Sequence, residues 1–376
     1  MDSDGRLESG EVIVFDDVCK TFADGTTAVD HLNLVAANGK LTVFVGSSGS
    51  GKTTALRMIN RMIEPTSGRV TVDGKDVSTV NPVTLRLGIG YVIQNAGLMP
   101  HQRVIDNVAT VPVLRGQSRR DAREAAYQVL ERVGLDARLA NRYPAQLSGG
   151  EQQRIGVARA LAADPPILLM DEPFSAVDPV VRVDLQNEIL RLQNELHKTI
   201  VFVTHDIDEA LKLADRVAIF GPGGVLQQYA EPAELLSRPA NGFVSNFIGL
   251  GRGYRWLQLI DADGLPLHPV DKISVGSVTD SAGAPAGWVL VVDGQGLPLG
   301  WIDDDGLRRH RDGAPLADAM TAVGSLFRPG DNLSQALDAA LSSPSNIGVA
   351  VDRGGMVIGG VLAADVLAVA DAQRRA

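Results

Sequence analysis

The segment that most constrains the fold is GSSGSGKTT at residues 46–54, which directly follows the apolar run LTVFV. Glycine lets the backbone turn sharply and bring several N–H groups to one point without a Cβ in the way. The helical pattern TTALRMINRMI comes next, so the positive end of its dipole faces the same point. The sequence therefore predicts a strand, an anion-binding loop and a helix.

The spacing of this segment fits G-x-x-x-x-G-K-[ST], in which loop N–H groups hold phosphates and the lysine reaches the β- and γ-phosphates. The hydroxyl after the lysine ligates Mg²⁺ in this motif. A glycine-rich turn with a solvated lysine is the alternative, but the flanking strand and helix favour a nucleotide site. The predicted nucleotide contacts are Gly46, Ser47, Ser48, Gly49, Ser50, Gly51, Lys52, Thr53 and Thr54, with Thr53 as a ligand of Mg²⁺.

The composition is that of an ordinary globular protein, with 45% hydrophobic and 21% charged residues. A chain of 376 residues is long for one domain and indicates two or three. The net charge of −10 argues against a nucleic-acid or anionic-membrane surface as the main function. No nucleic-acid partner is therefore expected.

The single cysteine, Cys19, excludes an internal disulfide framework and is compatible with a reducing compartment. We interpret it as a small buried hydrophobe near the end of a strand. The acidic start MDSDGRLESG lacks the regions of a secretory signal, and no run approaches the roughly 18 apolar residues of a membrane helix. The chain is therefore expected to be soluble.

Short apolar runs alternate with helical patterns over the first 248 residues. The predicted strands are VIVF, LTVFV, RVTV, GIGYVI, PILLM, TIVFV and RVAIF, and the clearest helices are Asp121–Val133, Glu151–Ala162, Val180–Leu196 and Ile207–Leu213. Runs such as PILLM are apolar throughout, which a sheet covered on both faces requires. The pattern predicts an α/β fold with a largely parallel core sheet.

Three predicted helix starts carry capping residues. Ser148 to Glu151 has the form of a capping box, and Asp178 precedes a proline at the first helical position. Asp206 is another expected cap, with the carboxylate of Glu209 three residues on. Each could serve local stability alone.

The alternation of strand and helix patterns stops after about residue 248, where the glycine-rich stretch IGLGRGYRW indicates a domain boundary. Beyond it, VLVVDGQGLPLGWIDDDGL resembles GVAVDRGGMVIGGVLAADVL at an offset of 59 residues. A fixed offset implies one supersecondary unit used twice. Each copy is predicted to be a hairpin with a short turn, followed by a helix.

Two adjacent carboxylates follow the strand ILLM in the stretch ILLMDEP. A buried strand that ends in two acids is costly unless they face a metal or a polarised water. Asp171 is therefore expected to hold Mg²⁺ and Glu172 to accept a proton from the attacking water. A strand that simply emerges into solvent is the alternative.

The stretch LSGGEQQR forms a second candidate anion site at a helix start. Ser148 is at the cap, while Gly149 and Gly150 permit close backbone approach, but no lysine is present. A second phosphate site about a hundred residues from the first suggests that two copies of the chain share one nucleotide.

Together, LSGGEQQR, GSSGSGKT and ILLMDEP resemble the ATP-binding cassette (ABC) ATPase family over roughly residues 11 to 248. The resemblance implies a P-loop NTPase in residues 1–250, with a mostly parallel sheet core, an antiparallel β subdomain and a helical subdomain at about 95–160. It implies a head-to-tail homodimer with ATP between unlike surfaces. Ser148, Gly149 and Gly150 would then contact the γ-phosphate bound to the other copy.

The same resemblance assigns roles that the residue types alone leave open. Gln94 would contact Mg²⁺ or the attacking water, and His205 would hold the γ-phosphate and orient that water. Phe22 would stack on adenine, and the loop from Ser175 to Asp178, with Val177 in place of the usual leucine, would contact the other copy. By sequence alone, a surface glutamine, a surface or metal-binding histidine and a core phenylalanine are the alternatives.

Finer resemblance, in IGYVIQNAGLMPH, TIVFVTHDIDEALKLADRVAIF and PAELLSRPANGFVSNFIG, is to importers of glycine betaine, carnitine, choline and proline. Members of that branch often append paired cystathionine-β-synthase-type (CBS) domains. Residues 251–376 are accordingly expected to be a smaller α+β regulatory domain. Of the CBS nucleotide ligands, Ala363–Asp365 retains only the aspartate, and Asp304–Gly306 matches poorly.

The resemblance thus implies an ATPase subunit of an osmoprotectant importer, with ATP and Mg²⁺ as cofactors. It would act as a homodimer, peripheral to the cytoplasmic face of the membrane, on separate permease subunits that contact the segment from Asn95 to Gln146. An extracytoplasmic solute-binding protein would complete the system. The alternatives are an importer of a polyamine or amino acid and a non-transport ABC ATPase.

Overall fold

The computed structural model describes residues 11–94, 96–175, 177–280 and 287–375. The chain divides into two compact units, Met1–Gly249 and Leu250–Ala376. The start MDSDGRLESG, Asn95 and Ala176 lie outside the described residues. No helix in the described ranges is both long and apolar enough to cross a membrane.

A six-stranded sheet with the order β10-β9-β3-β8-β7-β6 forms the centre of the first unit. All neighbours pair in parallel except β10, which runs antiparallel to β9 at one edge. Every residue of β3, β7 and β8 is buried, as expected for apolar strands of a sheet that is covered on both faces. The strands are β3 (Leu41–Gly46), β6 (Ile89–Val92), β7 (Ile167–Asp171), β8 (Thr199–Thr204), β9 (Arg216–Phe220) and β10 (Leu226–Ala230).

A second sheet of the first unit is antiparallel, with the order β2-β1-β4-β5. Side chains of both sheets share one apolar core, in which the rings of Phe15 and Phe44 pack edge to face. Its strands are β1 (Glu11–Thr21), β2 (Thr27–Ala37), β4 (Ser67–Val72) and β5 (Lys75–Asp76). The predicted mixed α/β architecture with an antiparallel β portion is confirmed.

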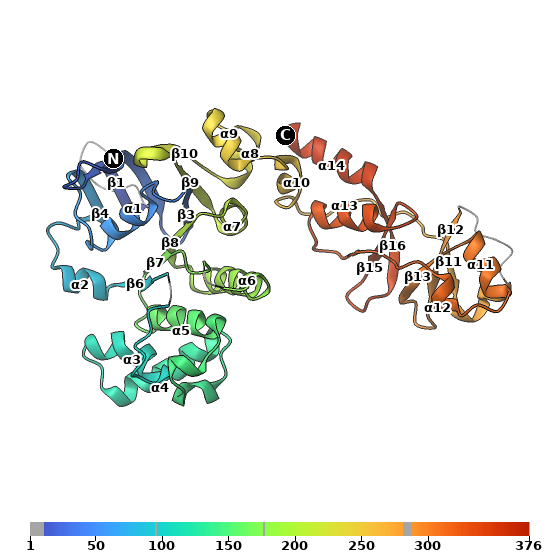
Figure 1. Ribbon diagram of the computed structural model, residues 1–376, viewed down its shortest axis with the longest axis horizontal. Helices are drawn as coiled ribbons and strands as arrows, with labels where there is room; N and C mark the ends of the chain where they lie inside the picture. The colour runs from blue at the N-terminus through green and yellow to red at the C-terminus, as the bar shows by residue number, and fades with distance from the viewer. Residues whose placement is uncertain (1–10, 95, 176, 281–286, 376) are drawn as a thin grey trace. The chain divides into compact units, whose positions relative to one another are not determined.

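Three helices, α3, α4 and α5, pack together away from the antiparallel sheet (Figure 1). They form the helical part of the first unit, within the residues where a helical subdomain is predicted. The helices of this unit are α1 (Lys52–Ile59), α2 (Pro82–Leu87), α3 (Val104–Leu114), α4 (Arg119–Arg132), α5 (Gly149–Leu161), α6 (Pro179–Leu196), α7 (Ile207–Leu213), α8 (Pro232–Ser237) and α9 (Gly242–Ile248).

Two expectations from the sequence are wrong in detail. The helix over TTALRMINRMI ends at Ile59, because Asn60 accepts the Met62 N–H with its side chain and Arg61 turns into the left-handed region at φ 53°. Cys19 is only half-buried and accepts a hydrogen bond from the His31 N–H, so it is not a core hydrophobe.

The second unit contains two three-stranded sheets, β11-β12-β13 and β14-β15-β16, and confirms the repeat. In each copy an antiparallel hairpin leads into a helix, and the bounds of both hairpin strands differ by 59 residues between copies. The elements are α10 (Arg252–Leu257), β11 (Lys272–Ser274), β12 (Trp288–Val292), β13 (Pro298–Asp303), α11 (Asp304–Arg311), α12 (Leu316–Ala319), β14 (Leu326–Phe327), α13 (Leu333–Ser342), β15 (Ile347–Val351), β16 (Val357–Leu362) and α14 (Ala363–Arg375).

The two hairpin turns are built alike. Asp293 accepts two backbone N–H groups of its turn, and Asp352 does the same in the second copy. Gly296 and Gly355 occupy the left-handed region at φ 86° and 84°, where a side chain would be strained. The repeat in sequence is therefore a repeat of turn chemistry.

Candidate functional site

The phosphate loop joins β3 to α1 and is organised around the Lys52 side chain. The Lys52 ammonium is buried and donates to the carbonyl oxygens of Gly46 (2.9 Å) and Ser47 (2.8 Å) and to Ser50 Oγ (3.3 Å). Burial lowers the pKa of Lys52, while the charges of Glu172 and Asp171 oppose that shift. The loop thus holds a desolvated cation at its centre, whose three donors are satisfied by the loop itself.

Two glycines of the loop are required by its packing. A Cβ on Gly51, whose φ is 87°, would lie 1.8 Å from the carbonyl oxygen of Ala28. A Cβ on Gly46 would lie 2.3 Å from the carbonyl oxygen of Phe220. The loop therefore presses against neighbouring backbone, and any larger residue at these positions would displace it.

Asp171 ends β7 as a buried carboxylate with several donors. Its Oδ1 accepts from Thr53 Oγ1 (2.8 Å), and its Oδ2 accepts from Tyr91 Oη (3.2 Å) and Arg57 Nη2 (3.3 Å). Adjacent oxygen ligands of octahedral Mg²⁺ lie about 2.9 Å apart, since each Mg–O distance is about 2.0–2.1 Å. The Thr53 and Asp171 oxygens therefore fit two neighbouring positions around that ion.

Glu172, Gln94 and His205 come together, as the sequence analysis expects. Glu172 Oε2 accepts from Gln94 Nε2 at 3.3 Å and lies 3.4 Å from His205 Nδ1. The residues follow β7, β6 and β8, whose carboxyl ends meet at one edge of the parallel sheet. Glu172 itself has φ 45°, a left-handed conformation that is uncommon for non-glycine residues.

The sequence analysis missed the buried contact between Thr204 and Glu209, which lie on either side of His205 in the sequence. Asp206 caps α7 as predicted, but the Glu209 carboxylate does not return to the helix start. It is buried and accepts from Thr204 Oγ1 at 2.6 Å and from Gln186 Nε2 at 3.2 Å. Burial raises the pKa of Glu209. The apolar neighbours of Glu209 in the sequence, Ala210 and Leu211, are the signal that could have indicated its burial.

The second predicted anion site is at the start of α5. Ser148 accepts from the Glu151 N–H, and Glu151 Oε2 accepts from the Ser148 N–H, which confirms the capping box. A Cβ on Gly150 would lie 2.6 Å from Val181 Cγ1, so a larger residue there would have to displace the Val181 side chain of α6. Helix α5 packs against α3, α4, α6 and β6, and Figure 1 shows it apart from α1, the helix that follows the phosphate loop.

Phe22 follows β1 in a tight turn, in which its N–H donates to the carbonyl of Thr26. The ring is 40% exposed and Lys20 Nζ lies 5.3 Å from its centroid. It is therefore not a core phenylalanine.

Comparisons with known proteins agree with this geometry. The sequence profile of the ABC transporter family matches residues 29–175. The choline transport ATP-binding protein OpuBA of Bacillus subtilis (strain 168) is 47% identical over 262 residues, which cover 70% of this chain and 67% of that protein. The glycine betaine uptake system ATP-binding protein YehX of Escherichia coli (strain K12) is 48% identical over 249 residues, 66% of this chain and 80% of that protein.

A solved structure with the same fold is the dimeric, post-hydrolysis ATP-binding cassette MJ0796 bound to ADP and Pi. It is 32% identical, has a TM-score of 0.54, and the match covers 58% of this chain and 98% of that one. The chain spans 60 to 67% of the length of the first curated relatives it matches. Because relatives nearly half identical to it carry the same cassette, this chain belongs to the ABC transporter family, among its ATP-binding proteins.

Proposed function

We propose that this protein hydrolyses ATP to energise an importer of quaternary-ammonium osmoprotectants such as glycine betaine and choline. The observation that carries the proposal is the meeting of Gln94, Glu172 and His205 at the sheet edge that also holds Asp171. A base, an amide and an imidazole beside a phosphate loop are the parts that hydrolysis of a γ-phosphate needs. The names of the relatives support the solute class.

Each residue of the site then has one role. Lys52 neutralises phosphate charge, while Thr53 and Asp171 hold Mg²⁺, which when bound offsets charge on the phosphate oxygens. Glu172 accepts the proton of the attacking water. His205 donates a hydrogen bond to the γ-phosphate, and Gln94 links the water or the metal to the helical part of the unit.

The proposed active form is a homodimer. Ser148, Gly149 and Gly150 would complete the γ-phosphate site of the other copy, because α5 and α1 lie apart within one chain (Figure 1). Exposed Phe22 would stack on the adenine of the nucleotide held by its own chain. The dimer of the related cassette supports this arrangement.

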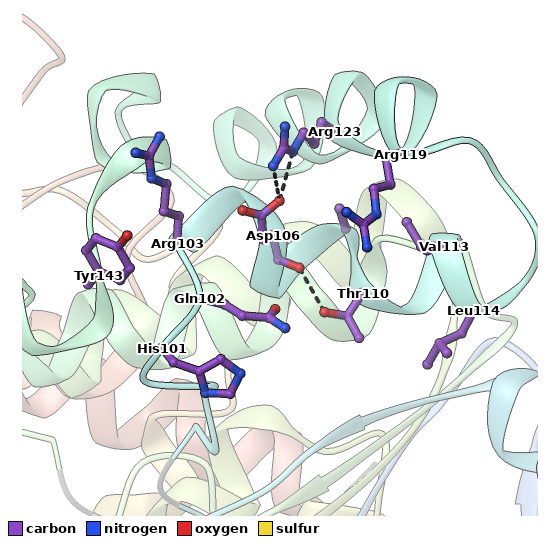
Figure 2. A pocket seen from close by; sticks show the side chains of 11 residues that line it. His101, Gln102, Arg103, Asp106, Thr110, Val113, Leu114, Arg119, Arg123 and Tyr143 are labelled. Carbon is purple, nitrogen blue, oxygen red and sulfur yellow. Dashed lines mark hydrogen bonds and ion pairs between the residues drawn. The ribbon is translucent and has the colours of Figure 1, made fainter.

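The permease is proposed to dock on the helical part of the unit, at a hollow of about 420 Å³ beside α3 and α4. Figure 2 shows Arg103 and Arg119 on either side of Asp106, whose carboxylate is paired with Arg123 at 2.6 Å. Leu114 adds an apolar edge, with 66% of its surface exposed. Basic side chains beside an apolar edge suit a short permease segment that carries a carboxylate, which would hold the protein at the cytoplasmic face of the membrane.

The test is ATPase activity of the protein reconstituted with its permease and solute-binding protein. We expect glycine betaine or choline to stimulate hydrolysis severalfold, and Lys52→Ala to abolish both basal and stimulated activity. If a polyamine or an amino acid stimulated hydrolysis instead, the proposed solute class would be wrong and the importer would carry that compound. Hydrolysis that no permease or solute changes would favour the non-transport alternative.

The second unit is proposed to be a CBS-like regulatory domain that responds to ionic strength. His268 Nε2 lies 2.7 Å from Asp365 Oδ2, so the aspartate that the resemblance would give to a nucleotide already has a partner from its own unit. Truncation at about residue 250 should then make uptake independent of osmolarity. Uptake that stays fully dependent, or tight binding of adenine nucleotides to the unit in calorimetry, would contradict this role.

A further inference from the structure

Two compensating bulges interrupt the β1–β2 ladder. The register moves from Phe15 opposite Leu34 to Val18 opposite Leu32, and then to Lys20 opposite Val29. Between the first two pairs β1 has one more residue than β2, and between the last two β2 has one more than β1. Asp17 and His31 lie at these bulges with φ 48° and 45°. Two left-handed non-glycine residues facing each other across one ladder are a local cost that an unbulged hairpin would avoid.

The bulge in β2 changes the alternation of side chains. Consecutive residues of a regular strand point to opposite faces, but here Asp30 and His31 both approach Cys19. One ligand atom from each of Cys19, Asp30 and His31 can be chosen so that all three lie within 4.8 Å of one another. His31 Nε2 is 4.0 Å from Asp30 Oδ1, and the thiol of Cys19 accepts the His31 N–H at 3.2 Å.

The His31 ring is oriented by its other nitrogen. Nδ1 lies 2.7 Å from Asp17 Oδ1, and because an ionised carboxylate only accepts, Nδ1 carries the proton of a neutral ring and Nε2 the lone pair. Asn33 connects both bulges, since its Oδ1 accepts the Asp17 N–H and its Nδ2 donates to the His31 carbonyl. A carboxylate behind a histidine is the usual support of a metal-binding imidazole.

We propose that Cys19, Asp30 and His31 form a zinc site, with Asp17 as the support of His31 and water in the fourth position. A thiolate with an imidazole and a carboxylate is a donor set that favours Zn²⁺ over Mg²⁺. Ligand atoms around tetrahedral zinc lie about 3.3–3.8 Å apart, given bonds of about 2.0–2.3 Å. The present separations need to close by about 1 Å, which the exposed side chains of His31 (70%) and Asp30 (46%) allow.

The single cysteine of the chain makes the test specific. Co²⁺ bound by a thiolate gives a charge-transfer absorption in the near ultraviolet, and Co²⁺ bound at the magnesium site through oxygen does not. We expect the full-length protein to bind one Co²⁺ per chain with this absorption, and Zn²⁺ to displace it. In the unmutated protein, Zn²⁺ should also protect Cys19 from maleimide, which requires no variant to fold.

Variants assign the ligands. Cys19→Ser should remove the absorption, and Asp30→Asn and His31→Ala should each weaken Co²⁺ binding at least about tenfold. Asp17→Asn should weaken it about tenfold through His31, whereas the matched control His197→Ala should bind like the unmutated chain. No absorption at millimolar Co²⁺, equal affinity in His31→Ala, or an absorption that depends on chain concentration because two chains share the ion would each overturn the proposal.

Discussion

Gln94 Nε2 donates to Glu172 Oε2 at 3.3 Å, although the two residues are 78 positions apart in the chain. The contact exists because β6 and β7 are parallel neighbours, so the residues just after their carboxyl ends meet. Beyond Gln94 the chain leads into α3 of the helical part. Movement of that part relative to the sheet would therefore act directly on the side chain proposed as the general base.

Glu172→Gln should slow ATP hydrolysis about 10²-fold or more, because an amide cannot accept the proton of the attacking water. ATP binding should be retained, since the phosphate contacts come from the loop around Lys52. The measurements are single-turnover hydrolysis and binding of a fluorescent ATP analogue. Glu131→Gln, an exposed residue of α4, is the matched control and should leave both unchanged. Unchanged turnover in Glu172→Gln would remove this residue from the proposed role.

Thr53→Val should raise the Mg²⁺ concentration needed for half-maximal hydrolysis by about tenfold or more, because it removes one of the two oxygens that fit the ion. Thr53→Ser keeps a hydroxyl and should need about as much Mg²⁺ as the unmutated protein. Titration of activity with Mg²⁺ at saturating ATP separates the two. Identical magnesium titrations for the valine and serine variants would show that the Thr53 hydroxyl is not a ligand.

Ser148→Ala and Ser118→Ala form a matched pair, because each serine caps a helix by accepting a backbone N–H three residues on. Each substitution should lower the free energy of unfolding by about 1 kcal/mol. Only Ser148→Ala should also slow hydrolysis, by about tenfold or more, since only Ser148 is proposed to contact the γ-phosphate of the other copy. Equal ATPase rates in both variants would leave Ser148 with a capping role alone.

The local motifs of this chain could be predicted from the sequence because backbone geometry determines their residue types. GSSGSGKTT has glycine where Gly46 and Gly51 pack against the backbone of other strands, and LSGGE contains the serine and glutamate of a capping box. The repeat at 59 residues could be predicted because Asp293 and Asp352 close the same turn. Apolar runs indicated the buried strands for the same reason, since both faces of the core sheet are covered.

What the sequence could not indicate depends on contacts between distant residues. Nothing near Tyr91 or Arg57 in the chain shows that both donate to Asp171, because the contacts arise from three separate elements. The strand β2 was missed because its alternation of buried and exposed residues is broken where Asp30 and His31 lie at the bulge. Cys19 was misread for the same reason, since its neighbours across the ladder depend on that register.

Thr204 and Glu209 should act as one unit in positioning His205. Thr204 Oγ1 donates to Glu209 at 2.6 Å and accepts the N–H of Asp206, so it holds the chain on both sides of the histidine. Thr204→Val and Glu209→Ala should each lower kcat more than they raise the KM for ATP. In a double-mutant cycle on kcat, the loss in the double variant should differ from the sum of the two single losses by about 1 kcal/mol. Additive effects, or a change in KM alone, would contradict a positioning role.

Glu209 should also make stability depend on pH. Burial raises the pKa of its carboxyl above the ordinary value of 4.5, so the folded chain keeps this proton when the unfolded chain has lost it. Its contribution to the free energy of unfolding is therefore fully present below pH 4.5 and is lost as the pH rises through the raised pKa. Glu209→Gln cannot titrate, so its thermal midpoint relative to the unmutated protein should rise over that pH interval. Asp208→Asn, on the exposed side of α7, is the control, and a midpoint difference for Glu209→Gln that stays constant with pH would refute the linkage.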